Sequence, residues 1–380
     1  MNYASQWSFF NPVQLNFGRG CLQELPALVS YSDNGLLVTS PSFTKRGITA
    51  EVIDLLQKNE ILVIDNIAPN PDLRDVESLW QSLKGHEINY IIAIGGGSVL
   101  DTAKALSYLL SLKDRDFTLS SHFRNKIKLP ENVPLPLIAA PTTAGTGSEV
   151  TPFATIWDMV EQKKYSLARP DLFPAIALLD PELTISLPWD ITVITGLDAL
   201  SHALESVWNR NANPVTLHYA EKAISLVIST LPRLKNAPSD IELRAKMLTA
   251  SLFGGLCISS TRTALAHSIS YPITAAYDMP HGLACGFTLP ALLSFNARAD
   301  DGRLAAVANE IGLASVEAFT LEIKLLFEQL DIKELLNQYN ITFDGLIKMR
   351  SAMFTPGRTD NNLRSVEEND LNWILSEALE

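Results

Sequence analysis

Asp198 and His202 are the residues whose types and spacing say most about the chemistry of this chain. They stand four positions apart in an Ala- and Leu-rich helical stretch, Gly196-Leu-Asp-Ala-Leu-Ser-His202. Side chains four residues apart on a helix project from one face, so these two could bind the same ion. Two further histidines, His267 and His281, follow in segments that could fold back onto that face. An aspartate with three imidazoles suits Fe²⁺ or Zn²⁺ better than Mg²⁺ or Ca²⁺.

The distribution of histidine favours a metal site over a coincidence. An Asp/His pair at this spacing also arises by chance, and His267 alone could be a hydrogen-bonded core histidine. However, the chain has only six histidines, and three of them occupy these positions. The others lie in polar segments, where we expect surface residues: His86, His122 and His218.

A glycine-rich turn follows residues 90–94, a β-branched apolar run typical of a buried strand. Its sequence is Gly95-Gly-Gly-Ser-Val-Leu-Asp-Thr-Ala-Lys104, and a helical pattern continues from it. Glycines between a strand and a helix let the backbone approach a diphosphate, and the helix N-terminus offers N–H donors. Ser98 and Asp101 have the spacing of a capping box. The turn is neither a GxGxxG fingerprint nor a P-loop, so a purely structural turn is the alternative.

A second polar loop, Pro141-Thr-Thr-Ala-Gly-Thr-Gly-Ser-Glu149, follows another expected strand. Its hydroxyl groups could bind a phosphate, a ribose or a carboxamide, although surface loops use the same residue types. Polar glycine loops at the carboxyl ends of two strands of one sheet predict a ligand crevice at that edge. The candidate donors are Thr142, Thr143, Thr146 and Ser148.

The elements that must position these residues change in character along the chain. The first half alternates apolar runs with amphipathic segments, which predicts an open parallel α/β sheet, whereas helical periodicity dominates the second half. We therefore predict an α/β domain over residues 1–186 and an all-helical domain over residues 187–380. The expected strands are 35–39, 61–64, 90–94, 135–139 and 175–179, with helices at 44–58 and 72–84. The expected helices of the second domain are 191–211, 214–231, 240–260 and 262–276.

The composition is that of an ordinary globular protein of 380 residues, 47% of them hydrophobic. Its formal charge of −12 argues against a nucleic-acid or anionic-membrane partner, since both require a basic face. Three scattered cysteines without a CxxC predict neither a disulfide framework nor a thiolate zinc site. The chain shows no signal peptide and no apolar run that could span a bilayer, so we expect a cytoplasmic, soluble protein.

Together, these motifs resemble those of the iron-containing (group III) alcohol dehydrogenases over essentially the whole chain. The resemblance rests on the two glycine loops, on Gly196 to Glu205, on the interval from His267 to His281, and on Asp180-Pro-Glu-Leu183. It implies a dehydroquinate synthase-like architecture. This comprises an N-terminal dinucleotide-binding α/β domain with a parallel sheet, an all-α C-terminal domain, and a metal and substrate site in the cleft between them. It also implies a homodimer, for which Val13-Gln-Leu-Asn-Phe17 is a candidate strand for pairing between subunits.

Carried over residue by residue, the resemblance assigns the metal, Fe²⁺ or alternatively Zn²⁺, to Asp198, His202, His267 and His281. The implied reaction is hydride transfer between NAD or NADP and a small alcohol or aldehyde whose oxygen the metal polarises. A lysine that reaches the ribose is implied at Lys164, or else at its neighbour Lys163. The implied coenzyme-binding residues are Ser40, Gly96, Gly97, Ser98, Asp101, Thr142, Thr143, Thr146, Ser148 and Lys164.

Two positions depart from the family pattern. Tyr271 stands where many members carry a second histidine near the nicotinamide, and a phenol is the poorer base at neutral pH. Ser40 stands where NAD-preferring relatives place an aspartate that repels a 2′-phosphate, and Lys45 and Arg46 lie nearby in the sequence. We therefore predict that NADPH is at least tolerated.

Arg262 is the candidate substrate-binding residue. If residues 259–267 form one helix, Arg262 lies one to one and a half turns before His267. A guanidinium there suits an anionic aldehyde, a carboxylate or a phosphonate, and the segment from Arg262 to Pro272 resembles the phosphonoacetaldehyde-reductase branch of the family. An interdomain salt bridge is the alternative. Cys285 could face the site, but we expect it to be a small buried residue, and Arg358 stays unassigned.

Other functions share this architecture. Glycerol dehydrogenases and dehydroquinate synthases typically bind Zn²⁺ through a carboxylate and two histidines, whereas the ligand pattern here favours the alcohol dehydrogenases. A protein that binds nucleotide and metal without catalysis, with Tyr271 marking the loss of activity, is a third alternative. Net conversion of the nicotinamide coenzyme separates these functions.

Overall fold

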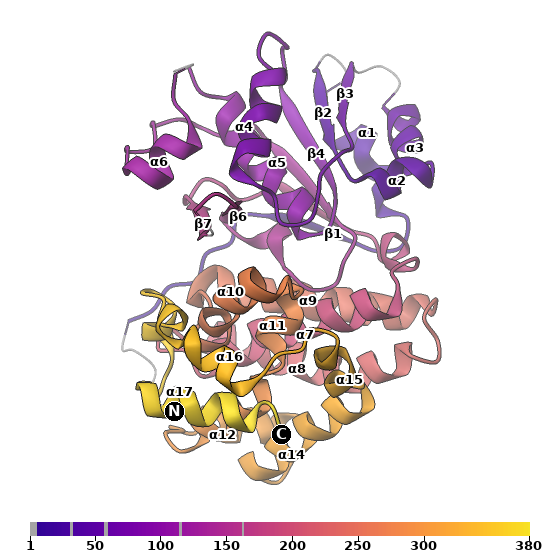
Figure 1. The fold of residues 1–380 in the computed structure, drawn as a ribbon. Coiled ribbons are helices and arrows are strands. Elements are labelled where there is room, and N and C mark those ends of the chain that lie inside the picture. Colours follow the sequence, from indigo (N-terminus) through magenta and orange to yellow (C-terminus); the bar gives the residue numbers. More distant parts are fainter. Residues whose placement is uncertain (1–5, 31–32, 57–59, 114–115, 162) are drawn as a thin grey trace. The chain divides into compact units, whose positions relative to one another are not determined.

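The chain forms two compact units (Figure 1). In this computed structural model the described residues are 6–30, 33–56, 60–113, 116–161 and 163–380. An α/β unit comprises Pro12–Thr143 and Ser148–Thr184, and a helical unit comprises residues 6–11, Ala144–Gly147 and Ile185–Glu380. The α/β unit ends at Thr184, two residues before the boundary predicted between residues 186 and 187. Two short segments of the predicted first domain belong to the helical unit, because they pack with it.

A sheet of six parallel strands forms the centre of the α/β unit. The strand order is β1-β8-β5-β4-β2-β3, and every neighbouring pair is parallel. All residues of β2 and β4 are buried, as expected for apolar strands covered on both faces. The strands are β1 (Gln14–Phe17), β2 (Gly35–Val38), β3 (Ile61–Ile64), β4 (Tyr90–Gly95), β5 (Leu137–Pro141) and β8 (Ile176–Leu179). The predicted fold class is confirmed.

Strand β1 is an edge strand of this sheet. It pairs on one side with β8 of the same chain, where Gln14 lies opposite Ile176. Leu15 and Phe17 are 42% and 46% exposed. The predicted strand at Val13–Phe17 is therefore part of the chain's own sheet, and its role in pairing between subunits stays a prediction.

Short helices cover the sheet and connect its strands. Leu36 of β2, Trp80 of α4 and Leu106 of α5 belong to one buried apolar cluster. The expected helix over 44–58 is instead two helices, α2 and α3, because Gly47 between them adopts a φ of +83°. Residues 57 and 58 of that prediction lie outside the described residues. The helices are α1 (Leu25–Leu28), α2 (Pro41–Lys45), α3 (Ile48–Leu55), α4 (Leu73–Ser82), α5 (Gly97–Leu110) and α6 (Leu119–Asn125).

An antiparallel hairpin, β6 (Phe153–Asp158) and β7 (Lys163–Ala168), forms a separate two-stranded sheet. The sequence analysis does not predict this hairpin. Its second strand is mostly polar and partly exposed, so it lacks the apolar run that marks the buried strands.

Three long helices, α7 (Trp189–Val207), α8 (Pro214–Leu234) and α9 (Ile241–Thr261), pack against one another in the helical unit. The start of α8 is fixed by a capping box between Asn213 and Thr216, and Asp240 caps α9. Within the described residues, the helices are all too short or too polar to span a bilayer. The shorter helices are α10 (Leu265–Tyr277), α11 (His281–Gly286), α12 (Leu289–Ala297), α13 (Arg303–Glu310), α14 (Val316–Gln329), α15 (Ile332–Asn337), α16 (Phe343–Lys348) and α17 (Glu368–Glu377).

Candidate functional site

Helix α7 supplies three ionisable side chains to the candidate metal site. Asp198 and His202 lie one turn apart and are each 4% exposed. The Nε2 atom of His202 lies 3.5 Å from Oδ1 of Asp198. Burial lowers the pKa of His202, which favours the neutral imidazole that a metal requires. Glu205, seven residues after Asp198, is completely buried.

Helices α10 and α11 bring two more histidines to this place. The Nε2 atom of His267 lies 3.7 Å from Oδ1 of Asp198, and the rings of His202 and His267 stack with centroids 4.9 Å apart. The ring of His281 meets that of His267 edge-on at 5.2 Å. The structure thus gathers all four predicted metal ligands within the helical unit.

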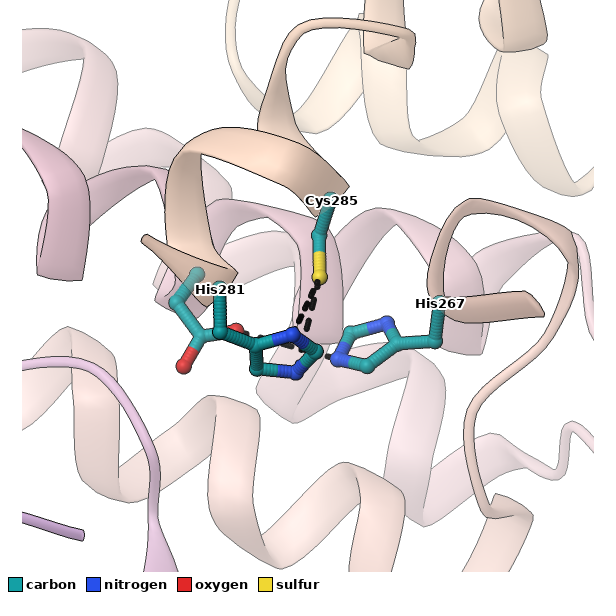
Figure 2. Close-up of side chains that lie close together, drawn as sticks. His267, His281 and Cys285 are labelled. Carbon is teal, nitrogen blue, oxygen red and sulfur yellow. Dashed lines mark hydrogen bonds and ion pairs between the residues drawn. The ribbon is translucent and has the colours of Figure 1, made fainter. Parts of the chain in front are cut away.

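Cys285 joins this group from the turn of α11 that follows His281. Its Sγ lies 3.6 Å from both ring nitrogens of His281 (Figure 2). One donor atom each from Asp198, His267, His281 and Cys285 lies within 4.8 Å of all the others. His202 is outside that set of four, although it contacts Asp198. Cys285 is fully buried, as expected, but its sulfur faces the histidines.

In that set of four, Asp198 Oδ1 and His267 Nε2 are buried without a hydrogen-bond partner among the described residues, and Nδ1 of His202 is a third such atom beside them. A buried polar atom left without a partner costs about 1–3 kcal/mol, so such atoms are rare unless something else binds them. Donors at 2.0–2.1 Å from a tetrahedral ion lie about 3.4 Å apart. The O–N distances of 3.5 and 3.7 Å around Asp198 Oδ1 are close to that value. The residues present therefore fit a divalent transition-metal ion.

Glu205 fixes the orientation of the His267 ring. Its Oε2 lies 2.6 Å from Nδ1 of His267, and its Oε1 accepts the backbone N–H of His267 at 3.2 Å. Burial alone raises the pKa of Glu205, but the charge and hydrogen bonds of His267 outweigh it and the pKa is lowered. An ionised Glu205 accepts the Nδ1 proton and holds the ring with Nε2 on the side of Asp198, a common arrangement behind metal-bound histidines.

The electrostatics of this group favour a positive charge at its centre. Burial lowers the pKa of His267, but the negative charges of Cys285 and Glu205 outweigh burial and raise that pKa well above its usual value. Glu205 is a functional residue that was not predicted from the sequence. The available signal was its position, because Asp198, His202 and Glu205 follow the i, i+4, i+7 spacing of one helix face.

A glycine sets the distance between α11 and α7. A Cβ atom on Gly282 would lie 2.1 Å from the carbonyl oxygen of Ile194 and 3.1 Å from Cβ of Asp198. Only glycine allows the two backbones to approach this closely. His281, the next residue back along the chain, is thereby held against the helix that carries Asp198.

Tyr271 and two arginines lie beside the metal-site candidate. The rings of Tyr271 and His281 stack with centroids 6.2 Å apart, and the Tyr271 hydroxyl accepts a hydrogen bond from Nε of Arg358 at 3.3 Å. Partial burial lowers the pKa of Arg262, and the positive charge of Arg358 lowers it further. In the part of the chain that the structure describes, neither arginine forms an ion pair with a carboxylate.

Arg262 connects two helices instead of lying within one. Helix α9 ends at Thr261, Arg262 has φ 60° and ψ 175°, and α10 begins at Leu265. The expectation of one helix over 259–267 is therefore wrong, because the chain turns at Arg262. Such a backbone conformation costs a residue other than glycine about 1–3 kcal/mol. Asn209 Nδ2 and Thr261 Oγ1 donate hydrogen bonds to the carbonyl of Arg262 at 3.1 and 2.9 Å and hold the turn.

The glycine turn lies at the carboxyl end of β4. Here β4 has β2 on one side and β5 on the other, and the chain runs outward from this point in both directions. Ligands of open α/β sheets bind at such a switch point. Helix α5 begins at Gly97 with Gly96 as its N-cap, and no side chain caps it. The first N–H groups of the helix can therefore serve a phosphate.

The predicted capping box at Ser98 and Asp101 is wrong, because the helix begins one residue before Ser98. Ser98 Oγ accepts the backbone N–H of Asn70 at 3.2 Å. The carboxylate of Asp101 accepts a hydrogen bond from the hydroxyl of Ser148 at 2.6 Å and another from the backbone N–H of Thr155 at 2.8 Å. Asp101 thus links α5 to the second loop and to the hairpin.

A fully buried lysine lies beneath the second loop. Lys104 Nζ donates hydrogen bonds to Ser148 Oγ at 2.8 Å and to Thr151 Oγ1 at 3.1 Å, and burial lowers the pKa of Lys104 to about 8. Glu149 is also fully buried, and neither of its carboxylate oxygens has a hydrogen-bond partner among the described residues. Burial raises the pKa of Glu149 to about 7. The hydroxyl of Ser148 is therefore already engaged by protein groups.

The threonines of the second loop divide between the two units. Thr142 follows β5, and its N–H donates to the carbonyl of Gly95 at 3.0 Å, which joins the two loops. A Cβ atom on Gly96 would lie 3.2 Å from Cγ2 of Thr143, so the turn also packs against that residue. Thr146 belongs to the segment that packs with the helical unit.

The remaining predicted coenzyme residues lie at the end of β2 and on the hairpin. Ser40 follows β2 as the N-cap residue of α2, with its Oγ 2.9 Å from that of Ser42. Lys164 Nζ lies 5.7 Å from the centre of the Trp157 ring, whereas Lys163 pairs with Glu161 at 2.9 Å. Both lysines stay predictions for the residue that reaches the ribose.

Comparisons with known proteins agree with this geometry. Residues 12–181 match the family described as iron-containing alcohol dehydrogenase, and residues 192–379 match the C-terminal part of the Fe-containing alcohol dehydrogenase family. The chain is 29% identical to choline dehydrogenase of Bacillus subtilis, over 97% of this chain and 94% of that protein. It is 30% identical to alcohol dehydrogenase 4 of Schizosaccharomyces pombe, over 90% and 83% of the two chains. The crystal structure of sulfoacetaldehyde reductase from Bifidobacterium kashiwanohense in complex with NAD⁺ matches with a TM-score of 0.91 and 30% identity, over 99% of this chain and 100% of that one.

Proposed function

Since this chain belongs to the iron-containing alcohol dehydrogenase family, we propose that it interconverts a small anionic aldehyde and its alcohol with NADPH or NADH. Membership of the family makes the chain an NAD(P)-linked alcohol dehydrogenase. The anionic substrate rests on one observation: Arg358 contacts Tyr271 beside His281, and its positive charge acts on a second arginine, Arg262.

The residues of the helical unit have separate tasks in this reaction. Asp198, His202, His267 and His281 would hold Fe²⁺ or Zn²⁺. When bound, the ion polarises the substrate oxygen and the nicotinamide supplies or accepts the hydride. Glu205 accepts the Nδ1 proton of His267 and orients the ring with Nε2 toward Asp198.

Tyr271 is the proton donor that we infer in place of the family's second histidine. Its hydroxyl lies beside His281 and accepts a hydrogen bond from Arg358 at 3.3 Å. A cation this close favours the phenolate, so it stabilises the form of Tyr271 that remains once the proton has moved to the substrate oxygen.

Arg262 and Arg358 repel each other electrostatically and have no carboxylate partner among the described residues, which supports an anion as their ligand. A phosphonate, sulfonate or carboxylate accepts paired hydrogen bonds from arginine and relieves the repulsion between the two cations. The backbone strain at Arg262 supports this role, because glycine would fit the turn without strain. The sulfoacetaldehyde reductase to which this chain is similar is named for an anionic aldehyde.

The test compares anionic with neutral aldehydes. We expect Arg262→Ala to lower kcat/KM for phosphonoacetaldehyde or sulfoacetaldehyde by about 10- to 100-fold, the worth of a charged hydrogen bond. The same substitution should leave kcat/KM for propionaldehyde nearly unchanged. Arg350→Ala is the matched control, since Arg350 pairs with Glu368 at 2.8 Å. Equal losses on charged and neutral aldehydes would refute the assignment.

The coenzyme preference depends on Ser40. No carboxylate stands at this position to repel a 2′-phosphate, so we expect NADPH to be accepted. Ser40→Asp should lower kcat/KM for NADPH and leave that for NADH largely intact. Efficient use of NADH with negligible turnover of NADPH by the unaltered protein would defeat this prediction.

A member of the family that binds coenzyme and metal without catalysis is the remaining alternative. It would convert no NADPH in the presence of Fe²⁺ or Zn²⁺ and a panel of aldehydes. A homodimer and a cytoplasmic location stay predictions, and the partly exposed edge strand β1 is the candidate for pairing between subunits.

A further inference from the structure

We propose that the sulfur of Cys285 is a ligand of the metal ion, which gives the site a mixed sulfur, nitrogen and oxygen donor set. The inference rests on the proposed function only in requiring that the ion binds here. It adds a residue that the family resemblance does not assign to the metal.

The spacing of the donor atoms supports this assignment. Sγ of Cys285 lies 3.6 Å from both Nδ1 and Nε2 of His281. With zinc–sulfur and zinc–nitrogen bonds of 2.3 and 2.0–2.1 Å, sulfur and nitrogen ligands of a tetrahedral ion lie about 3.6 Å apart. His281 and Cys285 stand four residues apart on α11, the same relation that Asp198 and His202 have on α7. Two such pairs from two helices contribute to one site.

The three cysteines of the chain differ in what their sulfur atoms contact. Cys257 is fully buried, and its Sγ donates to the backbone carbonyl of Thr216 at 3.2 Å. Cys21 makes a similar contact with the carbonyl of Asn16 at 3.7 Å. The sulfur of Cys285 contacts imidazole nitrogens instead (Figure 2). Cys257 and Cys21 therefore behave as ordinary buried thiols, and Cys285 does not.

Two unpartnered atoms supply an independent reason. Asp198 Oδ1 and His267 Nε2 are buried and have no hydrogen-bond partner among the described residues, and a donor atom of each of these two side chains lies within 4.8 Å of Sγ of Cys285. A cation bound between them would satisfy both atoms, and the sulfur is already within reach of the same centre. The cluster therefore indicates a ligand, whereas a lone buried thiol would not.

The chemistry of sulfur changes what the site prefers. On binding M²⁺ the thiol loses its proton to solvent, and the thiolate with the Asp198 carboxylate balances the two positive charges of the ion. A set of one carboxylate and three imidazoles leaves one positive charge in excess. Thiolate is a soft ligand that suits Zn²⁺, so we expect Cys285 to shift the metal preference from Fe²⁺ toward Zn²⁺.

Cobalt gives a direct test, because a Co²⁺–thiolate bond absorbs in the near ultraviolet through sulfur-to-metal charge transfer. The metal-free full-length protein is loaded with Co²⁺, and bound cobalt is counted by mass spectrometry. We expect the charge-transfer band in the unaltered protein and in Cys257→Ala, the matched control. We expect no such band in Cys285→Ser or Cys285→Ala. In a zinc-binding assay Cys285→Ala should weaken the affinity for Zn²⁺ at least 10-fold, more than for Fe²⁺.

The unaltered protein is decisive even if a variant fails to fold. Stoichiometric cobalt without the charge-transfer band would overturn the proposal and leave the proposed function standing. Persistence of the band in folded Cys285→Ala would also overturn it. Failure of the unaltered protein to bind any cobalt would overturn both the ligand and the metal-dependent function.

Discussion

The metal-site candidate and the coenzyme turn bind their ligands by opposite means. In the helical unit, ionisable side chains from three helices meet in a buried cluster, and two of their atoms lack protein partners. In the α/β unit, the backbone at the start of α5 provides the donors, and no side chain caps that helix. One site is made of side chains, and the other is made of main chain.

This difference determines how each site tolerates change. Side-chain donors in a buried cluster carry a cost when their ligand is absent, because their polar atoms stay unsatisfied. Backbone donors at a helix N-terminus can bond to water instead. We therefore expect the metal site to be sensitive to single substitutions. The coenzyme turn should be sensitive mainly to groups that obstruct the backbone.

The largest expected effect is the loss of a side-chain donor. His267→Ala should lower kcat/KM by about 10³-fold, since a metal ion contributes several kcal/mol to the stabilisation of charge in the transition state. Metal content by mass spectrometry should fall in parallel. His218→Ala, on the exposed surface of the same unit, is the control. An active, metal-loaded His267→Ala protein would show that the metal site does not depend on its individual side chains.

The second-largest effect should come from Gly282, where the backbones of α11 and α7 are in contact. In Gly282→Ala the added Cβ would lie 2.1 Å from the carbonyl oxygen of Ile194, so α11 must move away from α7. Overpacking of this kind costs about 1–3 kcal/mol and should displace His281, so we expect bound metal to fall well below one ion per chain. Gly312→Ala is a control for the added methyl group, because nothing lies within 4 Å of a Cβ there. Since Gly312 has a positive φ, that control also measures backbone strain without a steric clash. Full metal content in Gly282→Ala would show that side chains alone place His281.

A smaller effect should come from Glu205, which hydrogen-bonds the predicted ligand His267 and is not itself a predicted ligand. Glu205→Gln removes the charge that orients His267, and it should weaken metal affinity by about 10- to 100-fold without abolishing binding. Titration of the metal-free protein with Zn²⁺ measures this change. Glu205→Asp, which keeps the charge, should recover part of the affinity. No change in either variant would mean that the ring of His267 is oriented by packing.

The smallest expected effect concerns Glu149 in the α/β unit. Its pKa is raised from 4.5 to about 7 in the folded protein, so the folded state binds the proton more tightly than the unfolded state. Stability therefore falls as pH rises from 4.5 to 7. The shift of Lys104, whose pKa is lowered from 10.5 to about 8, acts instead above pH 8 and makes stability rise with pH there.

Glu149→Gln should accordingly gain about 2 kcal/mol of unfolding free energy, relative to the unaltered protein, between pH 5 and pH 7.5. Urea unfolding at the two pH values measures the gain, with the exposed Glu131→Gln as control. A difference that does not change with pH would mean that Glu149 keeps its charge when buried.

The sequence predicts the parts of this molecule that repeat a simple pattern. Strand β4 and helix α8 were found because an apolar β-branched run and a 3.6-residue periodicity identify buried strands and amphipathic helices. The Asp198/His202 pair was found for the same reason, since both members lie on one helix. Local spacing was enough for each of these features.

What the sequence does not reveal depends on contacts between distant segments. The side chain of Glu205 meets His267 62 residues later, and no local spacing indicates that contact. The orientation of Cys285 depends on how α11 packs on α7, and the left-handed backbone at Arg262 breaks a run that looks helical. Asp101 accepts hydrogen bonds from Ser148 and Thr155 instead of capping its own helix. In each case tertiary structure overrides a local preference.

The closeness of Gly282 to Ile194 has a consequence for sequence drift. Because the missing side chain of Gly282 sets the separation of the two helices, the backbone of His281 is held at a fixed distance from α7. Apolar side chains around it can be exchanged for others of similar volume without shifting that backbone. The interior of this unit can therefore diverge widely among descendants of one ancestor while a single position stays without a side chain.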